Sequence, residues 1–275
     1  MTATTSTVGT TPSAETYDFP ALVAGLERYL KLRSIPIGMK RFRQREEMEA
    51  IPRIRRPETA LTLDQVVAQS RQLGWTIGVT MDDLAGPQCG VPVGLHARTA
   101  EWLSGEAMEG VWYGTRADSA AHQAAMDAPE DGLYEALAVS PLTTGRLDPP
   151  DICLIYGTPG QMILFINGLQ YRNYEKLDFT CVGESACADS WGRALKTGKP
   201  SLSIPCYAER RFGGVADDEL LMALPACYLP QVVDGLAALH KNGLRYPIPG
   251  WGIQSDPRPS LAVSYPGRQA WKEPT

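Results

Sequence analysis

The sequence has few of the residues that identify metalloproteins and disulfide-bonded proteins. It holds three histidines, and none of its six cysteines is spaced as C-x-x-C from another. Histidine nitrogen and closely spaced cysteine sulfur are the usual ligands of zinc and iron–sulfur centres, so the pattern gives such a centre little support. Six cysteines in 275 residues, without a secretory signal, favour reduced cytoplasmic thiols over a disulfide framework.

Long apolar runs are also missing. The best run, MILFI at 162–166, is far shorter than the roughly 18 residues that cross a bilayer. The first residues, MTATTSTVGTTPSAE, lack the basic start and apolar centre of a signal peptide. We therefore expect a soluble cytoplasmic protein with no membrane association, and a disordered Thr/Ser-rich tail over residues 1–17.

Net positive charge is the third absence. The formal charge is −5 and the pI is about 5.3, which argues against a nucleic-acid partner, because such surfaces need clustered Lys and Arg. The one basic stretch, KRFRQR at 40–45 with RIRR at 53–56, encloses the acidic EEMEA. We interpret it as a solvated segment of mixed charge rather than a phosphate-binding patch.

Apolar periodicity and capping residues predict the main elements. Helices are expected at 18–34 with Asp18 as cap, at 60–75 with Thr62 as cap and Gly74 as stop, and at 158–170, 185–198, 216–225 and 230–243. Strands are expected at 35–42, 76–80, 134–142, 151–157, 177–182 and 201–207, with 134–142 and 151–157 forming the clearest pair.

Helices and strands alternate without a regular βαβ period, and no internal repeat is present. The pattern predicts an α/β or α+β fold, with a single mixed-sheet domain over 18–243 and helices packed on the sheet. Residues 244–275 are rich in Pro and Gly, and we expect them to form an irregular arm over the body or over a partner subunit.

The stretch VGESACADSW at 182–191 is the first candidate site. Ser185 lies in G-E-S-A-C, which is close to the G-x-S-x-G nucleophile elbow, with Cys187 in place of the last glycine. A serine triad would need His240 as base, with an orienting carboxylate from Asp217, Asp218 or Asp234.

The same stretch supports a thiol hypothesis. Cys187 is expected in the first turn of a helix, where the helix dipole favours the thiolate, and Glu184 could act as acid/base or cap the helix. The plain alternative is a packed strand-to-helix joint with a buried thiol, since free cysteine is among the most buried residue types.

Two other turns could bind an anion. YGTPGQ, with Tyr156, Thr158 and Gly160, ends a strand and opens a helix whose first N–H groups could hold a carboxylate, although a plain Thr–Pro helix start explains it equally. CYAERRFGG places Arg210 and Arg211 beside two glycines, where a guanidinium can bind a carboxylate or pair with the acids that follow.

A metal or iron–sulfur carrier is the alternative hypothesis. Its ligands would be Cys181, Cys187 and Cys206, with Cys89 as a fourth. The absence of ligand spacing counts against it.

Five segments carry a resemblance to a known family: LKLRSIPIGMKRF, GWTIGVTMDDLAGPQCG, DICLIYGTPGQMILFINGLQY, VGESACADSWGRAL and PCYAERRFGGVADDELLMALP. In their order and wording they resemble the ArCR family, domain of unknown function 169. The resemblance implies one family-wide domain and a small-molecule role. No catalytic residue follows from it, and the cofactor stays unknown.

We therefore expect a metabolic enzyme that binds a small organic anion, such as an aromatic or acyl carboxylate, where three turns converge. Arg210 and Arg211 would hold the anion, Thr158 and Gly160 would donate hydrogen bonds, and Glu184 with Cys187 or Ser185 would do the chemistry. The reaction class stays open. The remaining alternative is a non-catalytic subunit of a larger complex or homo-oligomer, assembled through the C-terminal arm.

Overall fold

A computed structural model describes residues 17–129 and 132–248. The expected tail at 1–17 and the expected arm at 244–275 lie almost wholly outside the described residues. Within the described ranges, no helix combines the length and the apolar character needed to span a bilayer.

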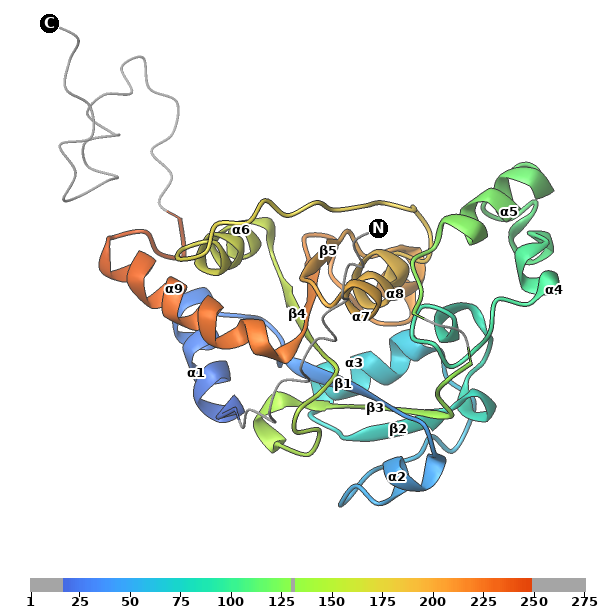
Figure 1. Cartoon of the computed structure of the whole chain (residues 1–275), viewed down its shortest axis with the longest axis horizontal. Helices are drawn as coiled ribbons and strands as arrows, with labels where there is room; N and C mark the ends of the chain where they lie inside the picture. The colour runs from blue at the N-terminus through green and yellow to red at the C-terminus, as the bar shows by residue number, and fades with distance from the viewer. Residues whose placement is uncertain (1–16, 130–131, 249–275) are drawn as a thin grey trace, which may run out of the picture.

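A six-stranded open sheet forms the centre of the described fold (Figure 1). Its order is β2-β3-β1-β4-β6-β5, and each pair of neighbours is antiparallel. The strands are β1 (Ile37–Phe42), β2 (Ile77–Thr80), β3 (Ala136–Pro141), β4 (Ile152–Gly157), β5 (Ser201–Ser203) and β6 (Leu220–Leu224). The fold is therefore α+β, one of the two expected classes. The sheet is antiparallel rather than mixed, because strand direction depends on the connections between strands and not on the residues of each strand.

Helices lie on both faces of the sheet. The α-helices are α1 (Phe19–Leu30), α2 (Arg45–Glu49), α3 (Leu63–Leu73), α4 (Ala100–Leu103), α5 (Arg116–Ala125), α6 (Pro159–Leu169), α7 (Arg193–Thr197), α8 (Tyr207–Arg211) and α9 (Leu229–Lys241). Short elements include the 3-10 turn η2 (Gln88–Gly90) and the π-helical turn η5 (Ala188–Gly192).

Alternate residues of β4 separate two cores. Cys153 and Ile155 pack with α1, α6 and α9, which lie together at the left of Figure 1. Leu154 and Tyr156 face the opposite core, which contains the apolar side of α3 together with Cys187. Because successive side chains of a strand point to opposite faces, Leu154 and Tyr156 face the core that contains Cys187, which belongs to the turn at 183–187.

The predicted helix starts are confirmed where a polar cap is present. Asp18 Oδ1 accepts from Ala21 N at 3.0 Å. Thr62 and Gln65 form a reciprocal capping box at the start of α3, which ends at Gly74 with φ +72°. Caps depend on residues close in sequence, so they can be found without knowledge of the fold.

The predicted pairing of 134–142 with 151–157 is wrong. Both strands exist, but β1 lies between them, and Met39 pairs with Val139 on one side and Ile152 on the other. Two strands near one another in sequence need not pair when a third, apolar strand can enter the sheet between them.

The predicted helix at 216–225 and the predicted strand at 177–182 are also wrong. The run LLMAL forms β6, because it is buried on both faces between β4 and β5, and periodicity alone cannot separate such a run from a helix. Residues 177–182 form no strand of the sheet. The Asp189 carboxylate accepts from Thr180 Oγ1 at 2.7 Å and from Val182 N at 2.9 Å instead.

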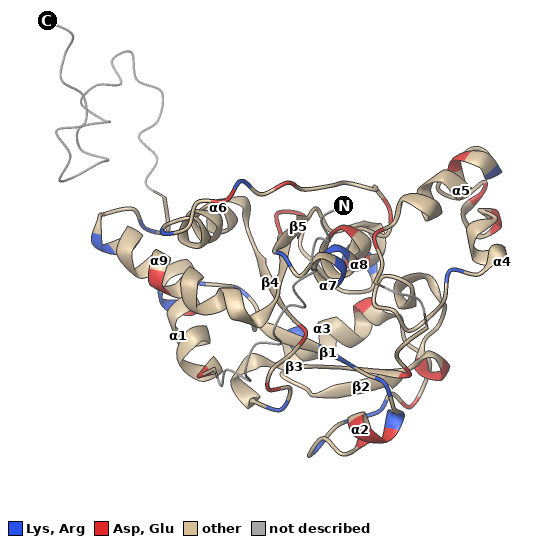
Figure 2. Cartoon of the chain, viewed as in Figure 1, with Lys and Arg blue, Asp and Glu red and all other residues tan. Residues whose placement is uncertain are grey.

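Part of the basic segment at 40–56 is paired with acids, some of them within the segment. Glu49 Oε1 accepts from Arg45 Nε at 2.6 Å and from Arg56 Nη1 at 2.9 Å. Arg41 Nε pairs with Asp151 at 2.9 Å. Figure 2 shows both signs of charge on α2, in agreement with the mixed-charge interpretation.

The crossing of α6 and α9 depends on Gly235. A Cβ added there would lie 2.0 Å from the carbonyl oxygen of Gly168, a backbone atom that cannot move aside. We expect Gly235→Ala to lower the free energy of unfolding by about 2–3 kcal/mol, because overpacking forces the helices apart. Urea denaturation measures the change. Gly160→Ala in α6 is the matched control, since its Cβ would meet only Tyr246 at 3.7 Å. Equal losses in the two variants would contradict the interpretation.

Candidate functional site

The turn at 183–187 is held in an unusual conformation. Buried Ser185 has φ +61° and follows Gly183 with φ +88°. A left-handed conformation at a residue other than glycine costs about 1–3 kcal/mol and persists where its surroundings enforce it. Gln88 Nε2 donates to Ser185 Oγ at 3.2 Å, and the π-helical turn η5 follows directly. Both features are common at functional sites.

The hydrolase triad is not assembled. Ser185 is bonded to the amide of Gln88, while the His240 ring packs against Tyr29 at a centroid distance of 5.4 Å, on the side of the sheet that α1 covers. Asp218 pairs with Arg33 at 2.8 Å. The nearest histidine contact to the turn is His122 Nε2, which lies 2.8 Å from the carbonyl oxygen of Glu184.

Beside this turn lies a group of acids and thiols that we call the acid–thiol cluster: Asp64, Cys89, Cys187, Cys206 and Glu209. Cys89 Sγ donates to Asp64 Oδ2 at 3.7 Å, and Cys206 N donates to Glu209 Oε2 at 3.0 Å. Cys187 Sγ donates to the carbonyl oxygen of Ser185 at 3.6 Å. The five residues come from α3, η2, the turn before η5, and α8, which the fold brings together.

Burial dominates the electrostatics of the cluster. It raises the pKa of Asp64 to about 6. Burial, followed by repulsion from Asp64, raises the pKa of Glu209 to about 8. Burial likewise raises the pKa of the Cys206 thiol. At neutral pH the Glu209 carboxyl is therefore protonated, and Asp64 is mostly ionised.

Each acid has one oxygen without a partner. Asp64 Oδ1 and Glu209 Oε1 are buried and make no hydrogen bond within the protein. Their residues are 3% and 1% exposed. Nearly all buried polar atoms in proteins are satisfied, so a water or a ligand atom is the expected partner of these oxygens.

A buried ion pair lies at one end of the cluster. Arg71 Nη1 pairs with Glu219 Oε2 at 3.2 Å and Nη2 donates to the carbonyl oxygen of Gly214 at 3.0 Å. The Arg71 guanidinium stacks on the Tyr156 ring at 4.2 Å. Burial, and then repulsion from Glu209, raise the pKa of the Tyr156 phenol. Tyr156 is thus the one predicted ligand residue from YGTPGQ that borders the cluster.

The other two residues predicted from YGTPGQ are elsewhere. Thr158 N donates to Gln161 Oε1 at 2.7 Å at the start of α6, whose apolar side packs on the opposite face of the sheet. Gly160 lies in the same helical turn, near Tyr246. The predicted convergence of three turns is therefore only partial. YGTPGQ follows the end of β4 and CYAERRFGG follows the end of β5, and these strand ends lie at the same end of the sheet. The residues that follow the two turns, however, pack on different faces of the sheet.

The turns VGESAC and CYAERRFGG do meet. Glu184 Oε2 accepts from Tyr207 N at 3.2 Å, so this half-buried carboxylate links the two turns. Gly213 lets α8 approach α3, because a Cβ there would lie 2.6 Å from the carbonyl oxygen of Glu209 and 3.3 Å from that of Asp64.

The two predicted anion-binding arginines differ. Arg210 is half-buried, and its guanidinium donates to the carbonyl oxygens of Pro205 and Ala216, which holds the loop after β5 together. Arg211 is exposed and lies over its neighbour Phe212 at 5.8 Å.

The cysteines proposed as metal ligands are not all together. Cys181 is exposed, whereas Cys187 and Cys206 are buried in the cluster with part-buried Cys89. Among the described residues, no group of three His, Cys, Asp or Glu side chains is arranged to hold a metal ion. The carrier hypothesis stays a prediction.

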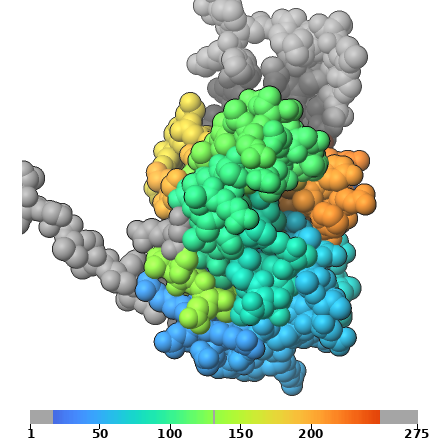
Figure 3. Space-filling view, turned by 90° about the vertical axis from the view of Figure 1, so that its right-hand side faces the viewer, coloured from blue at the N-terminus to red at the C-terminus, as the bar shows by residue number. Residues whose placement is uncertain are grey.

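A lobe at 99–128, containing α4 and α5, covers the turn. Its Trp102 and Met126 pack with Ala188. Trp112 contacts Tyr207 of α8 edge to face, at 5.4 Å between ring centroids. In Figure 3 the green part of this lobe lies next to the orange segment around residue 210. The lobe therefore shields the strained turn from solvent.

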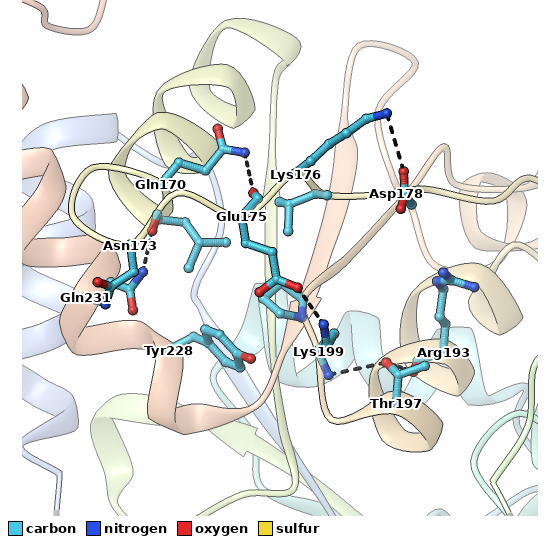
Figure 4. A pocket seen from close by; sticks show the side chains of 13 residues that line it. Gln170, Asn173, Glu175, Lys176, Asp178, Arg193, Thr197, Lys199, Tyr228 and Gln231 are labelled. Carbon is cyan, nitrogen blue, oxygen red and sulfur yellow. Dashed lines mark hydrogen bonds and ion pairs between the residues drawn. The ribbon is translucent and has the colours of Figure 1, made fainter.

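A separate cleft lies between the segment at 169–178 and the residues near 197–200 (Figure 4). Its volume is about 190 Å³. The polar groups in it bond mainly to one another, for example Lys199 Nζ to Glu175 Oε1 at 2.5 Å and Gln170 Nε2 to the carbonyl oxygen of Glu175 at 2.8 Å. It contains none of the predicted site residues.

Sequence reasoning missed three members of the site: Asp64, Glu209 and Gln88. Asp64 resembles an ordinary first-turn acid of a helix, and Gln88 has no motif. One feature of the sequence could have indicated Glu209. It lies three residues after Cys206, at the position where an acid caps the start of a helix.

The arginines provide a matched test. We expect Arg210→Ala to lower the free energy of unfolding by about 1–3 kcal/mol, because two carbonyl oxygens lose their charged donor. Arg211→Ala should stay within about 0.5 kcal/mol of the wild type, since it is exposed. Chemical denaturation of both variants measures the difference. If Arg210→Ala were as stable as Arg211→Ala, the assignment of Arg210 to loop structure would fail.

Glu209 predicts a pH dependence of stability. Its pKa is about 8 in the folded protein against an ordinary 4.5. Between these values the folded protein holds a proton that the unfolded chain has released, so the free energy of unfolding falls as the pH rises through this window. We expect Glu209→Gln to flatten the fall, and Asp64→Asn to act only in the lower window, up to about pH 6. Urea titrations over this range measure it, and an unchanged slope in Glu209→Gln would contradict the burial argument.

Comparison with known proteins identifies the family but no activity. Neither the curated proteins nor the solved structures gave a match. The family described as uncharacterised ArCR, domain of unknown function 169, matches residues 25–235, a range that contains the whole acid–thiol cluster. The resemblance found in the sequence is thereby confirmed. This chain belongs to the uncharacterised ArCR family.

Proposed function

We propose that this protein is a metabolic enzyme that binds a small organic carboxylate at the acid–thiol cluster and acts on it by proton transfer. The ligand would lie against the strained turn, under the lobe at 99–128. The proposal keeps the small organic anion expected from the sequence, and it moves the main acid/base role from Glu184 to Glu209 and Asp64.

One observation carries the proposal: two buried carboxyl groups interact electrostatically, and each has an unpartnered oxygen. Their pKa values of about 6 and about 8 lie on either side of neutral pH. A pair of acids whose environments separate their pKa values supplies one proton acceptor and one proton donor at the same pH. Perturbed acids of this kind gather at functional sites.

Protonated Glu209 suits an anionic ligand. A neutral carboxylic acid can donate a hydrogen bond to a carboxylate oxygen without charge repulsion, whereas an ionised one would repel it. Ionised Asp64 can accept a proton from the ligand or from Cys89. Arg71, at the Tyr156 end of the cluster, has a buried Nε without a partner, and its charge is paired with Glu219.

The other predicted residues keep supporting roles in this proposal. Ser185 shapes the turn, Cys187 borders the acids, and Glu184 joins the two turns at the half-buried edge. Arg211 is exposed near this edge and could attract an anion, while Arg210 keeps the loop in place.

Binding of benzoate and butyrate tests the proposal. We expect either probe to bind the wild type at neutral pH, with affinity falling by about tenfold per pH unit above the pKa of Glu209, because binding requires its proton. Glu209→Gln should bind with affinity that no longer changes with pH, and Asp64→Asn should bind but lose turnover once a substrate is found. Isothermal titration calorimetry at several pH values measures this.

Glu175→Gln is the matched control, because Glu175 is an acid in the separate cleft of Figure 4. Loss of binding in Glu175→Gln, together with a pH dependence of affinity in Glu209→Gln that equals the wild type, would place the ligand in that cleft and overturn the proposal. The proposal would also be overturned if neither benzoate nor butyrate bound to the wild-type protein.

A further inference from the structure

Another cleft lies at the edge of the sheet that β2 forms (Figure 1), and no residue of the acid–thiol cluster lines it. Its walls are the segment at 55–61, the side of α3 that carries Gln69, and the residues Trp75 and Ile77. Its volume is about 520 Å³, which falls in the range of roughly 300–1,000 Å³ that is usual for small-molecule pockets. The cleft is therefore large enough for a ligand of its own.

The outer wall of this cleft is anchored to the sheet at both ends. At one end, the backbone N–H of Arg55 donates to the carbonyl oxygen of Thr76 at 2.9 Å, and that of Gly78 donates to the carbonyl oxygen of Arg55 at 2.9 Å. At the other end, the N–H of Leu61 donates to the carbonyl oxygen of Asp83 at 3.0 Å. These backbone bonds hold the wall beside β2 and the turn after it, so its position does not depend on its side chains.

Arg55 lines the cleft with a positive charge that has no acid partner. Its guanidinium lies over the Trp75 ring, 4.1 Å from the centroid. Its side chain makes neither a hydrogen bond nor an ion pair with a residue in the described part of the chain. Arg56 differs, because it pairs with Glu49 at 2.9 Å and with Asp83. Stacking on an aromatic face leaves the N–H edge of a guanidinium available, and that edge fits a carboxylate through two parallel hydrogen bonds.

Glu58 lines the same cleft with an unpaired negative charge. It lies three residues after Arg55, yet the two side chains form no ion pair with each other, and within residues 17–129 and 132–248 Glu58 has no other partner. A ligand with only an anionic group would be attracted by Arg55 and repelled by Glu58. A ligand with both an anionic and a cationic group satisfies both residues, since complementary charges favour binding.

The inner side of the cleft is apolar. Trp75 and Leu61 are half-buried and pack against the core that contains Ile77. Gln69 of α3 is half-buried as well, and its side-chain amide makes no hydrogen bond to another described residue. An aliphatic group can therefore lie against Trp75 and Leu61, while the Gln69 amide is available to a polar atom of the ligand.

We propose that this cleft binds a small zwitterion, such as an amino acid with an aliphatic side chain. Arg55 holds the carboxylate, Glu58 holds the ammonium group, and the side chain of the ligand packs on Trp75 and Leu61. The proposal does not depend on the proposed function, because it concerns different residues and a ligand that carries both charges.

Three compounds with related carbon skeletons test the ligand class: L-leucine, 4-methylpentanoate, which lacks the ammonium group, and 3-methylbutylamine, which lacks the carboxylate. Isothermal titration calorimetry on the full chain at neutral pH measures the binding of L-leucine. Because 4-methylpentanoate also suits the acid–thiol cluster, each analogue is then added to the L-leucine complex, and its displacement of L-leucine is measured by competition titration. We expect the affinity of either analogue for this cleft to be about tenfold or more below that of L-leucine, because each leaves one charged residue unpaired.

Single substitutions test the two charged residues. Arg55→Gln and Glu58→Gln should each weaken L-leucine binding by about ten- to a hundredfold. Both side chains are exposed, so both variants should unfold at nearly the same temperature as the wild type. Arg53→Gln and Glu46→Gln are the matched controls, because these exposed residues are close in sequence but do not line the cleft. Both controls should keep the wild-type affinity.

Failure of L-leucine to bind the wild type at millimolar concentration would overturn the proposal. Equal affinities of L-leucine and 4-methylpentanoate in the competition titration would do the same. So would L-leucine binding that Arg55→Gln and Glu58→Gln weaken no more than their controls do.

The proposed function has separate readouts. Arg55→Gln should leave the pH-dependent binding of benzoate unchanged, and Glu209→Gln should leave the binding of L-leucine unchanged. Failure of one proposal can therefore be told apart from failure of the other.

Discussion

The desolvation of Asp64 and Glu209 is the constraint on which the chemistry of this protein depends. A carboxyl group removed from water prefers its neutral form, and repulsion between two such groups separates their pKa values further. Because each acid also has a free oxygen, the protein leaves part of the desolvation cost uncompensated. Evolution retains such a cost most readily where a ligand or a proton transfer makes use of it.

The arrangement of the sheet produces this desolvation. The C-terminal ends of β4 and β5 lie at the same end of the sheet, with the start of β6 between them. Gly157 pairs with Leu220 there, and Ser203 pairs with Leu221. From this edge α8 folds back toward the start of α3, and Gly213 allows the close approach. The lobe at 99–128 then packs on η5 and covers the remaining side. Acids on two short segments are thus enclosed without any acid-rich motif.

The turn at 183–187 shows how far sequence reasoning reached. The hypothesis of a packed joint that borders a site agrees with buried Cys187 and with the strained backbone of Ser185. The particular chemistry could not be inferred, because the partner of Ser185, Gln88, is nearly a hundred residues away in the chain. Similarly, the sequence pattern predicts Arg210 as an anion ligand, whereas its guanidinium bonds to the backbone carbonyl oxygens of Pro205 and Ala216.

By itself, the sequence determined what local interactions decide. The caps at Asp18 and Thr62 and the stop at Gly74 are set by side chains and backbone groups within a few residues of one another, and so are most helix positions. The ordered succession of family segments also identified the ArCR resemblance.

Only the tertiary structure decided that β1 separates β3 from β4, that LLMAL is a strand, and that the residues of the acid–thiol cluster lie together. These features depend on contacts between distant segments, and the free energy of burying a group depends on everything that surrounds it. No single segment contains that information.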